Sequence, residues 1–503
     1  MRRAKILATL GPASNTQEII ESMIEAGVNA VRINMSHGTT EEHAETIDRA
    51  RAAAAKLGKP LSVLVDLSGP KIRTRTLANG PVQLKPGAQF TITTRDVPGD
   101  ETIVSTNFDH LPQVVEPGTR ILIDDGAIEL VVLSETETDV TCQVVVGGLL
   151  NERKGINLPY TSLPIPSMTE KDRKDLEWAM TKNVDFIALS FVRKAEDCVE
   201  AKQRIKELDR RKHSRALLVA KIEKAEAIEN LDSIIQATDG VMVARGDLGV
   251  ETSVEHVPVY QKRIIKEAVA HDKFVITATQ MLQSMIESPH PTRAEASDVA
   301  NAVWDGSDAV MLSAETASGH YPLETVATMA RIIDAAETLK PAELRRPVKF
   351  SQPPSGRTSQ ALCKAAAYAA KEVMTEKVAV FTDSGLMARR LSTIRSGLQT
   401  FGLTTSHDAY NQLSLIWGVQ PFYHTAVRGA EPMDTIGNVT MFDLSSAGAD
   451  ATEELLKVGE RTLLDAGVVE PGETLIMMAG RLSGHGLSSS VIVWTIGADV
   501  PRR

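Results

Sequence analysis

The sequence predicts an α/β protein built around a (β/α)8, or TIM, barrel, with an inserted small β-barrel lid domain and a C-terminal α/β domain. Three observations predict this architecture. Eight apolar runs recur along residues 1–340, and helical patterns separate most of them. One interval between two runs lacks a long helical pattern and contains short β-rich segments instead. A new alternation of helices and strands begins after a proline-rich segment near residue 350.

The eight strand candidates are nearly continuous apolar runs, which is typical of parallel strands buried on both faces. They are Ile6–Leu10, Ala30–Met35, Leu61–Leu67, Phe186–Phe191, Leu217–Glu223, Val241–Arg245, Phe274–Gln280 and Ala309–Glu315. The helices expected between and after them are Gln17–Ala26, Glu42–Leu57, Glu170–Lys182, Ala195–Arg211, Ala225–Ala237, Val257–His271, Arg293–Val303 and Leu323–Glu337. A doubly wound open sheet is the alternative, but eight strand–helix units fit closure into a barrel better.

The exceptional interval lies between Leu67 and Glu170, where turn signals such as Lys85-Pro86-Gly87 separate short β runs. An insertion after the third strand leaves the barrel at the face where active sites form, so it is a candidate lid. The alternative is a structural decoration. We expect barrel residues 1–69 and 169–340, a lid of residues 70–168, a linker of residues 341–356 and a C-terminal domain of residues 357–503.

Composition narrows the range of partners. The chain has 503 residues and a net charge of −10, so it lacks the basic balance of a nucleic-acid-binding protein. No apolar run reaches transmembrane length, and the basic N-terminus breaks at a Gly-Pro pair too early for a signal peptide. The three cysteines, Cys142, Cys198 and Cys363, are widely separated. We therefore expect a cytoplasmic protein without membrane or nucleic-acid partners.

Charged residues gather where the predicted strands end. Lys221 and Glu223 alternate at the end of the fifth strand, so they share a side, and Asp247 follows the sixth strand. Two converging carboxylates need a cation between them, and Mg²⁺, completed by water and phosphate oxygens, suits that position. The alternative interpretation is a surface salt bridge beside an Asp in a turn.

Other strand ends add to this group. Arg32, Asn34 and Ser36 alternate at the second strand end, where an Arg fork suits phosphate or carboxylate. Asp66 closes the third strand, and Thr277 and Thr279 would share a face at the seventh, where a hydroxyl could donate a proton. The remaining cations stand at the lid junction and are Lys71, Arg73 and Lys154. A metal surrounded by several cations suits phosphoryl transfer, which requires positioning and charge neutralisation.

An ordered set of motifs resembles the pyruvate kinase family over nearly the whole chain. These motifs are Leu10-Gly11-Pro12-Ala13-Ser14, Arg32-Ile33-Asn34-Met35-Ser36-His37-Gly38, Gly69-Pro70-Lys71-Ile72-Arg73, Lys154-Gly155-Ile156-Asn157-Leu158-Pro159, Lys221-Ile222-Glu223, Met242-Val243-Ala244-Arg245-Gly246-Asp247-Leu248-Gly249, Ala278-Thr279-Gln280-Met281 and Pro291-Thr292-Arg293-Ala294-Glu295. The resemblance implies a glycolytic, allosteric and tetrameric enzyme that transfers the phosphoryl group of phosphoenolpyruvate to ADP, giving pyruvate and ATP.

The resemblance also implies a role for each matching position. Glu223 and Asp247 would hold Mg²⁺, or Mn²⁺ in its place, and Lys221 would stabilise the transferring phosphoryl group. Thr279 would assist protonation of the enolate, and the Gly246 and Asp247 amides would bind the substrate carboxylate. The residues that would serve the phosphates and the nucleotide are Arg32, Asn34, Arg73, Lys154, His37 and Pro12.

Departures from the family pattern lead to two further expectations. The family's K⁺ site corresponds to Asn34, Ser36, Asp66 and Leu67, but this chain places Lys71 where many members have Glu, so we expect no K⁺ requirement. The loop Thr382–Met387 lacks the two cations of the animal sugar-bisphosphate loop, so we expect no activation by fructose 1,6-bisphosphate there. Arg481–Gly486 is left as a candidate for another effector.

Two other function classes remain open from the residues alone. A metal-dependent pyruvate-enolate lyase or aldolase would use the carboxylates and Arg32 but leaves Lys221 and the lid cations unexplained. A non-catalytic sugar-phosphate sensor would bind its ligand in the C-terminal domain without turnover.

Overall fold

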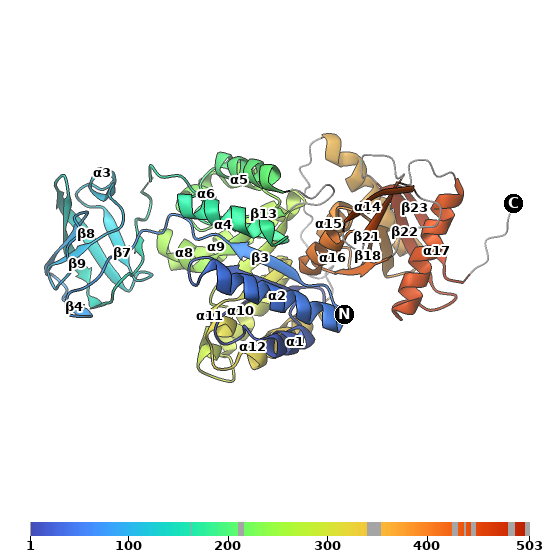
Figure 1. Ribbon diagram of the computed structural model, residues 1–503, viewed down its shortest axis with the longest axis horizontal. Helices are drawn as coiled ribbons and strands as arrows, with labels where there is room; N and C mark the ends of the chain where they lie inside the picture. Colours follow the sequence, from blue (N-terminus) through green and yellow to red (C-terminus); the bar gives the residue numbers. More distant parts are fainter. Residues whose placement is uncertain are drawn as a thin grey trace.

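The computed structural model describes residues 2–161, 163–209, 216–339, 354–424, 431–436, 439–443, 449–480 and 488–497. Three bodies follow one another along the long axis of the molecule (Figure 1): the inserted β unit, the barrel and the C-terminal α/β unit. No helix in these ranges is both long enough and apolar enough to cross a bilayer.

The central body is the predicted barrel. Eight parallel strands close in the order β1-β16-β15-β14-β13-β12-β3-β2. They are β1 (Lys5–Thr9), β2 (Ala30–Asn34), β3 (Ser62–Asp66), β12 (Phe186–Leu189), β13 (Leu217–Ile222), β14 (Gly240–Ala244), β15 (Phe274–Ala278) and β16 (Ala309–Leu312). Around them lie α1 (Gln17–Ala26), α2 (Thr40–Leu57), α4 (Glu170–Thr181), α5 (Ala195–Leu208), α6 (Ala225–Glu229), α7 (Leu231–Ala237), α8 (Arg245–Glu251), α9 (Val257–Ala270), α10 (Arg293–Asp305), α11 (Ala314–Ala317) and α12 (Pro322–Ala336).

Alternation along the strands separates the barrel interior from its outer wall. Leu7, Leu64, Val219 and Phe274 belong to one buried cluster that also includes Phe186, whereas their neighbours in sequence pack toward the helices. The rings of Phe186 and Phe274 meet edge to face at 5.4 Å. Two positions beyond Leu7, Leu64 and Val219, the inward-facing residues Thr9, Asp66 and Lys221 reach the C-terminal mouth of the barrel, whereas Ala188 and Ile276 still belong to the interior cluster. This period of two is what places polar side chains there.

The inserted residues form an all-β unit between β3 and α4. Its strands are β4 (Val82–Leu84), β5 (Gln89–Thr93), β6 (Ile103–Ser105), β7 (Arg120–Ile123), β8 (Ile128–Glu135), β9 (Asp139–Val146), β10 (Gly148–Leu150) and β11 (Ile156–Asn157), with one short helix, α3 (Leu111–Val114). They build a six-stranded sheet, β11-β7-β8-β9-β5-β6, and a two-stranded sheet, β10-β4. Phe90, Ile121 and Leu130 fill a core separate from that of the barrel.

The C-terminal body is a five-stranded sheet in the order β19-β18-β17-β22-β23. Its strands are β17 (Lys377–Phe381), β18 (Gln399–Thr404), β19 (Val419–Tyr423), β22 (Thr474–Gly480) and β23 (Ser488–Thr495). The accompanying helices are α14 (Pro354–Glu372), α15 (Leu386–Thr393), α16 (His407–Gln412) and α17 (Ala449–Asp465), and β20 (Glu431–Ile436) pairs with β21 (Val439–Asp443).

This C-terminal body closes the end of the barrel opposite the mouth. Leu413 and Leu415 join the buried cluster of the barrel interior. The Lys5 ammonium donates to the Val419 carbonyl at 2.7 Å. The lid and the C-terminal body therefore lie against opposite ends of the barrel, as Figure 1 shows.

Two expectations differ from the observed structure. The helix expected over Ala225–Ala237 is two helices that meet at Asn230. The sixth strand ends at Ala244, and Arg245 already begins α8, where its guanidinium binds Asp298 at 2.7 Å. Of the expected linker 341–356, residues 341–353 lie outside the described residues, and Pro354 already begins α14. Arg481–Gly486 also lies outside them.

Candidate active site

A chain of polar contacts crosses the mouth of the barrel from strand to strand. Arg32 is two residues beyond Ala30 on β2, and its guanidinium donates to Thr9 on β1 at 3.1 Å and to Asp66 on β3 at 2.7 Å. Asp66 lies in turn 3.3 Å from the ammonium of Lys221 on β13. Strand alternation thus brings together Arg32, Asp66 and Lys221, which are far apart in sequence.

Lys221 is the centre of this group. Its side chain is 12% exposed, donates to the Ser190 hydroxyl at 2.7 Å and lies 3.5 Å from Glu223. Burial alone would lower the pKa of Lys221, but Asp66 and Glu223 outweigh burial and raise the pKa above its ordinary value. The ammonium is therefore a fixed positive charge at the mouth.

Glu223 is fully buried and only partly satisfied. One carboxylate oxygen accepts from the Phe191 amide at 2.6 Å, and the other has no hydrogen-bond partner among the described residues. Burial raises the pKa of Glu223 to about 7, with a further contribution from Asp247, while Lys221 opposes the rise. This second oxygen has the Lys221 ammonium at 3.5 Å as an ion-pair partner but accepts no hydrogen bond from a described residue, so a cation bound between Glu223 and Asp247 would stabilise it further.

Asp247 lies in the first turn of α8, which begins directly after β14. One of its oxygens is 3.5 Å from the Lys71 ammonium, at the root of the lid. Within the described ranges, no cluster of three or more His, Cys, Asp or Glu side chains forms a complete metal cage. Two carboxylates with open positions nevertheless match the way Mg²⁺ binds, because it retains waters and takes substrate phosphate oxygens as ligands.

Thr279 stands at the end of β15 in a left-handed conformation, with φ of 69°. This conformation is strained for a β-branched residue, and such strain concentrates at functional sites. The Thr279 hydroxyl accepts from the Gly246 amide at 2.8 Å and donates to the Ala278 carbonyl. The expectation that Thr277 shares its face is wrong, because Ile276 and Ala278 face the interior while Thr277 points outward to Ser307 at 2.7 Å.

Two of the three predicted lid cations bind groups within the lid. Lys154 pairs with Asp124 of the lid at 2.9 Å, and the Arg73 guanidinium donates to the Arg153 carbonyl at 3.0 Å. His37 sits near three cations, and burial first, then Arg73 and Arg32, lower its pKa. Pro12 is exposed in the turn after β1. Of the three lid cations, Lys71 therefore reaches a barrel carboxylate, whereas Arg73 and Lys154 contact groups of the lid.

Several residues expected at a monovalent-cation site, or at its substitute, lie close together: Asn34 and Asp66 are register partners on β2 and β3, and Ser190 contacts both Asp66 and Leu67. The Asn34 side chain accepts from the Ser36 amide at 3.2 Å, and Leu67 accepts through its carbonyl from the Ser190 hydroxyl at 2.7 Å. Asp66 is held by Arg32 and Lys221, whereas the Lys71 ammonium faces Asp247.

Two residues of the site were missed in the sequence. Ser190 bridges Lys221, the Leu67 carbonyl and Asp66, and it follows the interior residue Ala188 by two positions, so strand alternation could have identified it. Phe191 has a φ of 56° and supplies the amide that holds Glu223. Nothing in the sequence signals that conformation.

Comparison with known proteins agrees with this geometry. Residues 1–326 match the family model described as "Pyruvate kinase, barrel domain", and residues 360–493 match "Pyruvate kinase, alpha/beta domain". A pyruvate kinase of Methylorubrum extorquens is 41% identical over 93% of this chain and 94% of its own length. One of Bacillus licheniformis is 38% identical over 100% of this chain and 82% of its own.

A solved structure extends the comparison to the fold. The crystal structure of a pyruvate kinase from Cryptosporidium parvum superposes with a TM-score of 0.87 at 32% identity, covering 98% of this chain and 96% of that one. The barrel, the polar mouth and these matches lead to one conclusion: the chain belongs to the pyruvate kinase family.

Proposed function

We propose that this protein transfers the phosphoryl group of phosphoenolpyruvate to ADP, giving pyruvate and ATP, as a glycolytic enzyme. The observation that carries the proposal is the Lys221 ammonium, which is held between Asp66 and Glu223 at the barrel mouth. The partly exposed carboxylate of Asp247 is close enough to affect Glu223 electrostatically. A buried fixed cation beside metal-competent carboxylates suits the charge that develops during phosphoryl transfer. The lyase and sensor alternatives leave this arrangement unexplained.

In this proposal Lys221 and Arg32 bind the phosphoryl group. Both are preorganised, because Asp66 fixes Arg32 at 2.7 Å and Ser190 fixes Lys221 at 2.7 Å. Preorganised donors spend no reorganisation energy at the moment of transfer. The charge of the phosphoryl group is thereby neutralised from the barrel side.

Glu223 and Asp247 are the proposed ligands of Mg²⁺, or of Mn²⁺ in its place. The second Glu223 oxygen supports the fit, since no hydrogen-bond donor among the described residues reaches it and the Lys221 ammonium lies 3.5 Å away, so a divalent ion could still bind there. When bound, such an ion would supply positive charge that neutralises the oxygens of the substrate. Thr279 would deliver a proton to the enolate through its hydroxyl, and the Gly246 amide that it now accepts from would become available to the substrate carboxylate.

The nucleotide would lie on the lid side of the mouth. We place Arg73, Lys154, His37, Asn34 and Pro12 there. Lys154 is now paired with Asp124, so this assignment requires the Lys154 ammonium to exchange that partner for a phosphate when the nucleotide binds. A 34% exposed side chain can make this exchange at little cost.

The other expectations remain proposals. Lys71 would take the place of K⁺, because its ammonium already reaches the mouth at Asp247. We also propose a homotetramer in the cytoplasm, on the resemblance to the family and on the three free, buried cysteines.

The direct test is pyruvate formation from phosphoenolpyruvate and ADP with Mg²⁺, measured in K⁺ and again in an inert bulky cation. Turnover in both supports the kinase and Lys71 as the internal cation. Turnover in K⁺ alone supports the kinase and refutes the role of Lys71. Retro-aldol activity without ADP, or ligand binding without turnover, would refute the kinase.

A further inference from the structure

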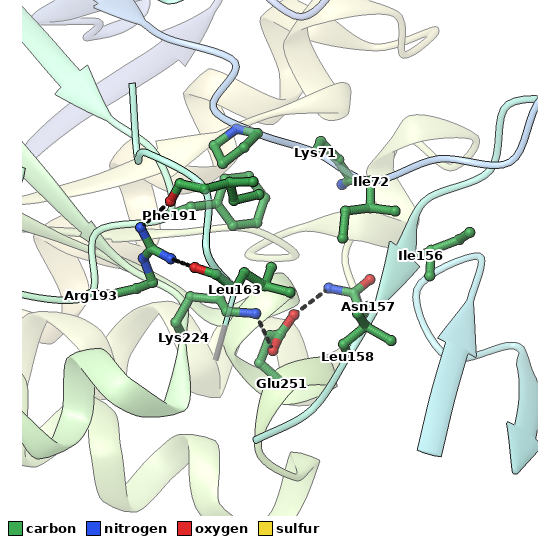
Figure 2. A pocket seen from close by; sticks show the side chains of 12 residues that line it. Lys71, Ile72, Ile156, Asn157, Leu158, Leu163, Phe191, Arg193, Lys224 and Glu251 are labelled. Carbon is green, nitrogen blue, oxygen red and sulfur yellow. Dashed lines mark hydrogen bonds and ion pairs between the residues drawn. The ribbon is translucent and has the colours of Figure 1, made fainter. Parts of the chain in front are cut away.

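A buried polar network lies at the root of the lid, outside the groups assigned to the reaction (Figure 2). The Lys224 ammonium binds Glu251 at 2.7 Å, and the Asn157 side-chain amide donates to the other oxygen of Glu251 at 2.8 Å. Asn157 is 4% exposed, Lys224 is 4% exposed and Glu251 is 1% exposed. Glu251 is thus held from two sides and is shielded from solvent.

The three residues come from three segments that matter for the site. Lys224 directly follows Glu223, and Glu251 ends α8, the helix that carries Asp247 in its first turn. Asn157 belongs to β11 of the lid and follows Lys154 by three residues. The Lys224–Glu251 pair therefore joins the two carboxylate-bearing segments, and Asn157 joins the lid to that pair.

The surroundings make the network strong and specific. Ile72, Ile156, Leu158, Leu163 and Phe191 line the adjacent pocket, so water screens the charges weakly (Figure 2). A hydrogen bond to a buried charged group is stronger than one between neutral groups. A second carboxylate in place of the amide would face Glu251 directly, with both groups out of water.

A second anchor holds the return connection of the lid. The Arg193 guanidinium donates to the carbonyls of Leu163 and Ile165, each at 2.5 Å. Near Glu251, Tyr160 adds a longer contact, from its hydroxyl to the Thr252 carbonyl at 3.4 Å. With Arg193 fixing the connection after β11, the Asn157–Glu251 bond is in a position to fix the orientation of the lid sheet.

We propose that Asn157 is a positioning residue that seats the lid on the Lys224–Glu251 pair, so that the lid cations face the metal-binding carboxylates. Its consequence for turnover rests on the proposed phosphoryl transfer. Loss of the Asn157 bond leaves the Lys224–Glu251 pair intact, so the barrel groups keep their positions. The lid loses its hydrogen bond to Glu251, and its orientation relative to the barrel is no longer fixed there.

The first test measures the lid directly and requires no activity. Cysteines replace Leu133 on the lid, which is 42% exposed, and Val259 on α9, which is 60% exposed, and both receive spin labels. The native cysteines are buried. The distribution of distances between the labels should broaden or shift in N157A and N157D. It should match that of the parent in N151A, the same truncation at a half-buried lid asparagine. Identical distributions in all four proteins would overturn the proposal.

The second test separates positioning from packing. Asp has the shape of Asn, so a packing role predicts little change in N157D, whereas loss of the donor beside Glu251 predicts a larger loss than in N157A. In N157A we expect kcat/KM for ADP to fall about 10- to 100-fold, as for a lost hydrogen bond to a buried charge.

A barrel-only reaction provides the internal reference. Exchange of the C3 protons of pyruvate with D₂O, with Mg²⁺ present, requires the enolate groups of the barrel but no nucleotide, and should stay within about twofold of the parent. Equal losses in exchange and transfer, or N157D turnover equal to that of the parent, would overturn the proposal. If the parent forms no pyruvate, the proposed function fails, while the label distances still decide the role of Asn157.

Discussion

Replacing Lys221 by Met tests the centre of the proposed mechanism. The substitution keeps the length and apolar stem of the side chain and removes the ammonium that lies 3.3 Å from Asp66 and 3.5 Å from Glu223. Asp66 retains Arg32 as a partner, but Glu223 retains just the Phe191 amide among the contacts described for it. We therefore expect the loss of stabilising contacts to affect Glu223 more than Asp66.

The magnitude follows from these distances. At an effective dielectric constant of about 20, an ammonium at 3.3–3.5 Å interacts with each carboxylate by about 5 kcal/mol before the cost of desolvation. Breaking a buried pair typically lowers the free energy of unfolding by about 3–5 kcal/mol, and Arg32 should keep the loss near the lower value. Because a preorganised electrostatic donor is lost, kcat should fall by at least about 10²- to 10³-fold.

Two assays check this expectation. Pyruvate formation gives kcat, and chemical denaturation gives the free energy of unfolding, which should fall because the buried contacts of Lys221 with Asp66 and Glu223 are lost. Lys202→Met is the matched control, since it also loses an ion pair, to Asp239 at 2.7 Å, but lies on α5. Turnover of Lys221→Met near that of the control, in folded protein, would refute the assignment of Lys221.

Four further predictions concern other parts of the molecule. Ser190→Ala should lower kcat about tenfold or more by releasing the Lys221 ammonium, while Ser190→Thr keeps the hydroxyl and most of the activity; equal effects would count against the hydrogen bond. Lys71→Glu should make turnover depend on K⁺, and unchanged activity without K⁺ would remove Lys71 from that role. Chelation of divalent metal should abolish turnover, and added Mg²⁺ should restore it. Burial is the main cause that lowers the pKa of Lys5 from 10.5 to about 7. Between these two pH values Lys5 is protonated in the unfolded chain but largely neutral in the folded chain, so the free energy of unfolding rises with pH. Lys5→Met, which also loses the bond to Val419, should flatten that rise in thermal denaturation; an unchanged pH slope would contradict it.

The sequence by itself determined which residues reach the mouth from the barrel strands. Arg32, Asp66 and Lys221 each stand two positions beyond an interior apolar residue, and the strand period of two fixes the side on which they emerge. The apolar runs likewise specified eight parallel strands, because such runs can be buried on both faces. Alternation holds while the backbone stays extended, so these expectations needed no tertiary information.

Tertiary structure decided what happens where the strands end. Thr279 and Phe191 adopt left-handed conformations that break alternation, so the Thr279 hydroxyl meets Gly246 and the Phe191 amide meets Glu223. The hydrogen bond from Asn157 to Glu251 joins residues 94 positions apart, and no local sequence pattern specifies such a pair. Propensity and periodicity act over a few residues, whereas these contacts depend on how the lid, the loops and the barrel pack together.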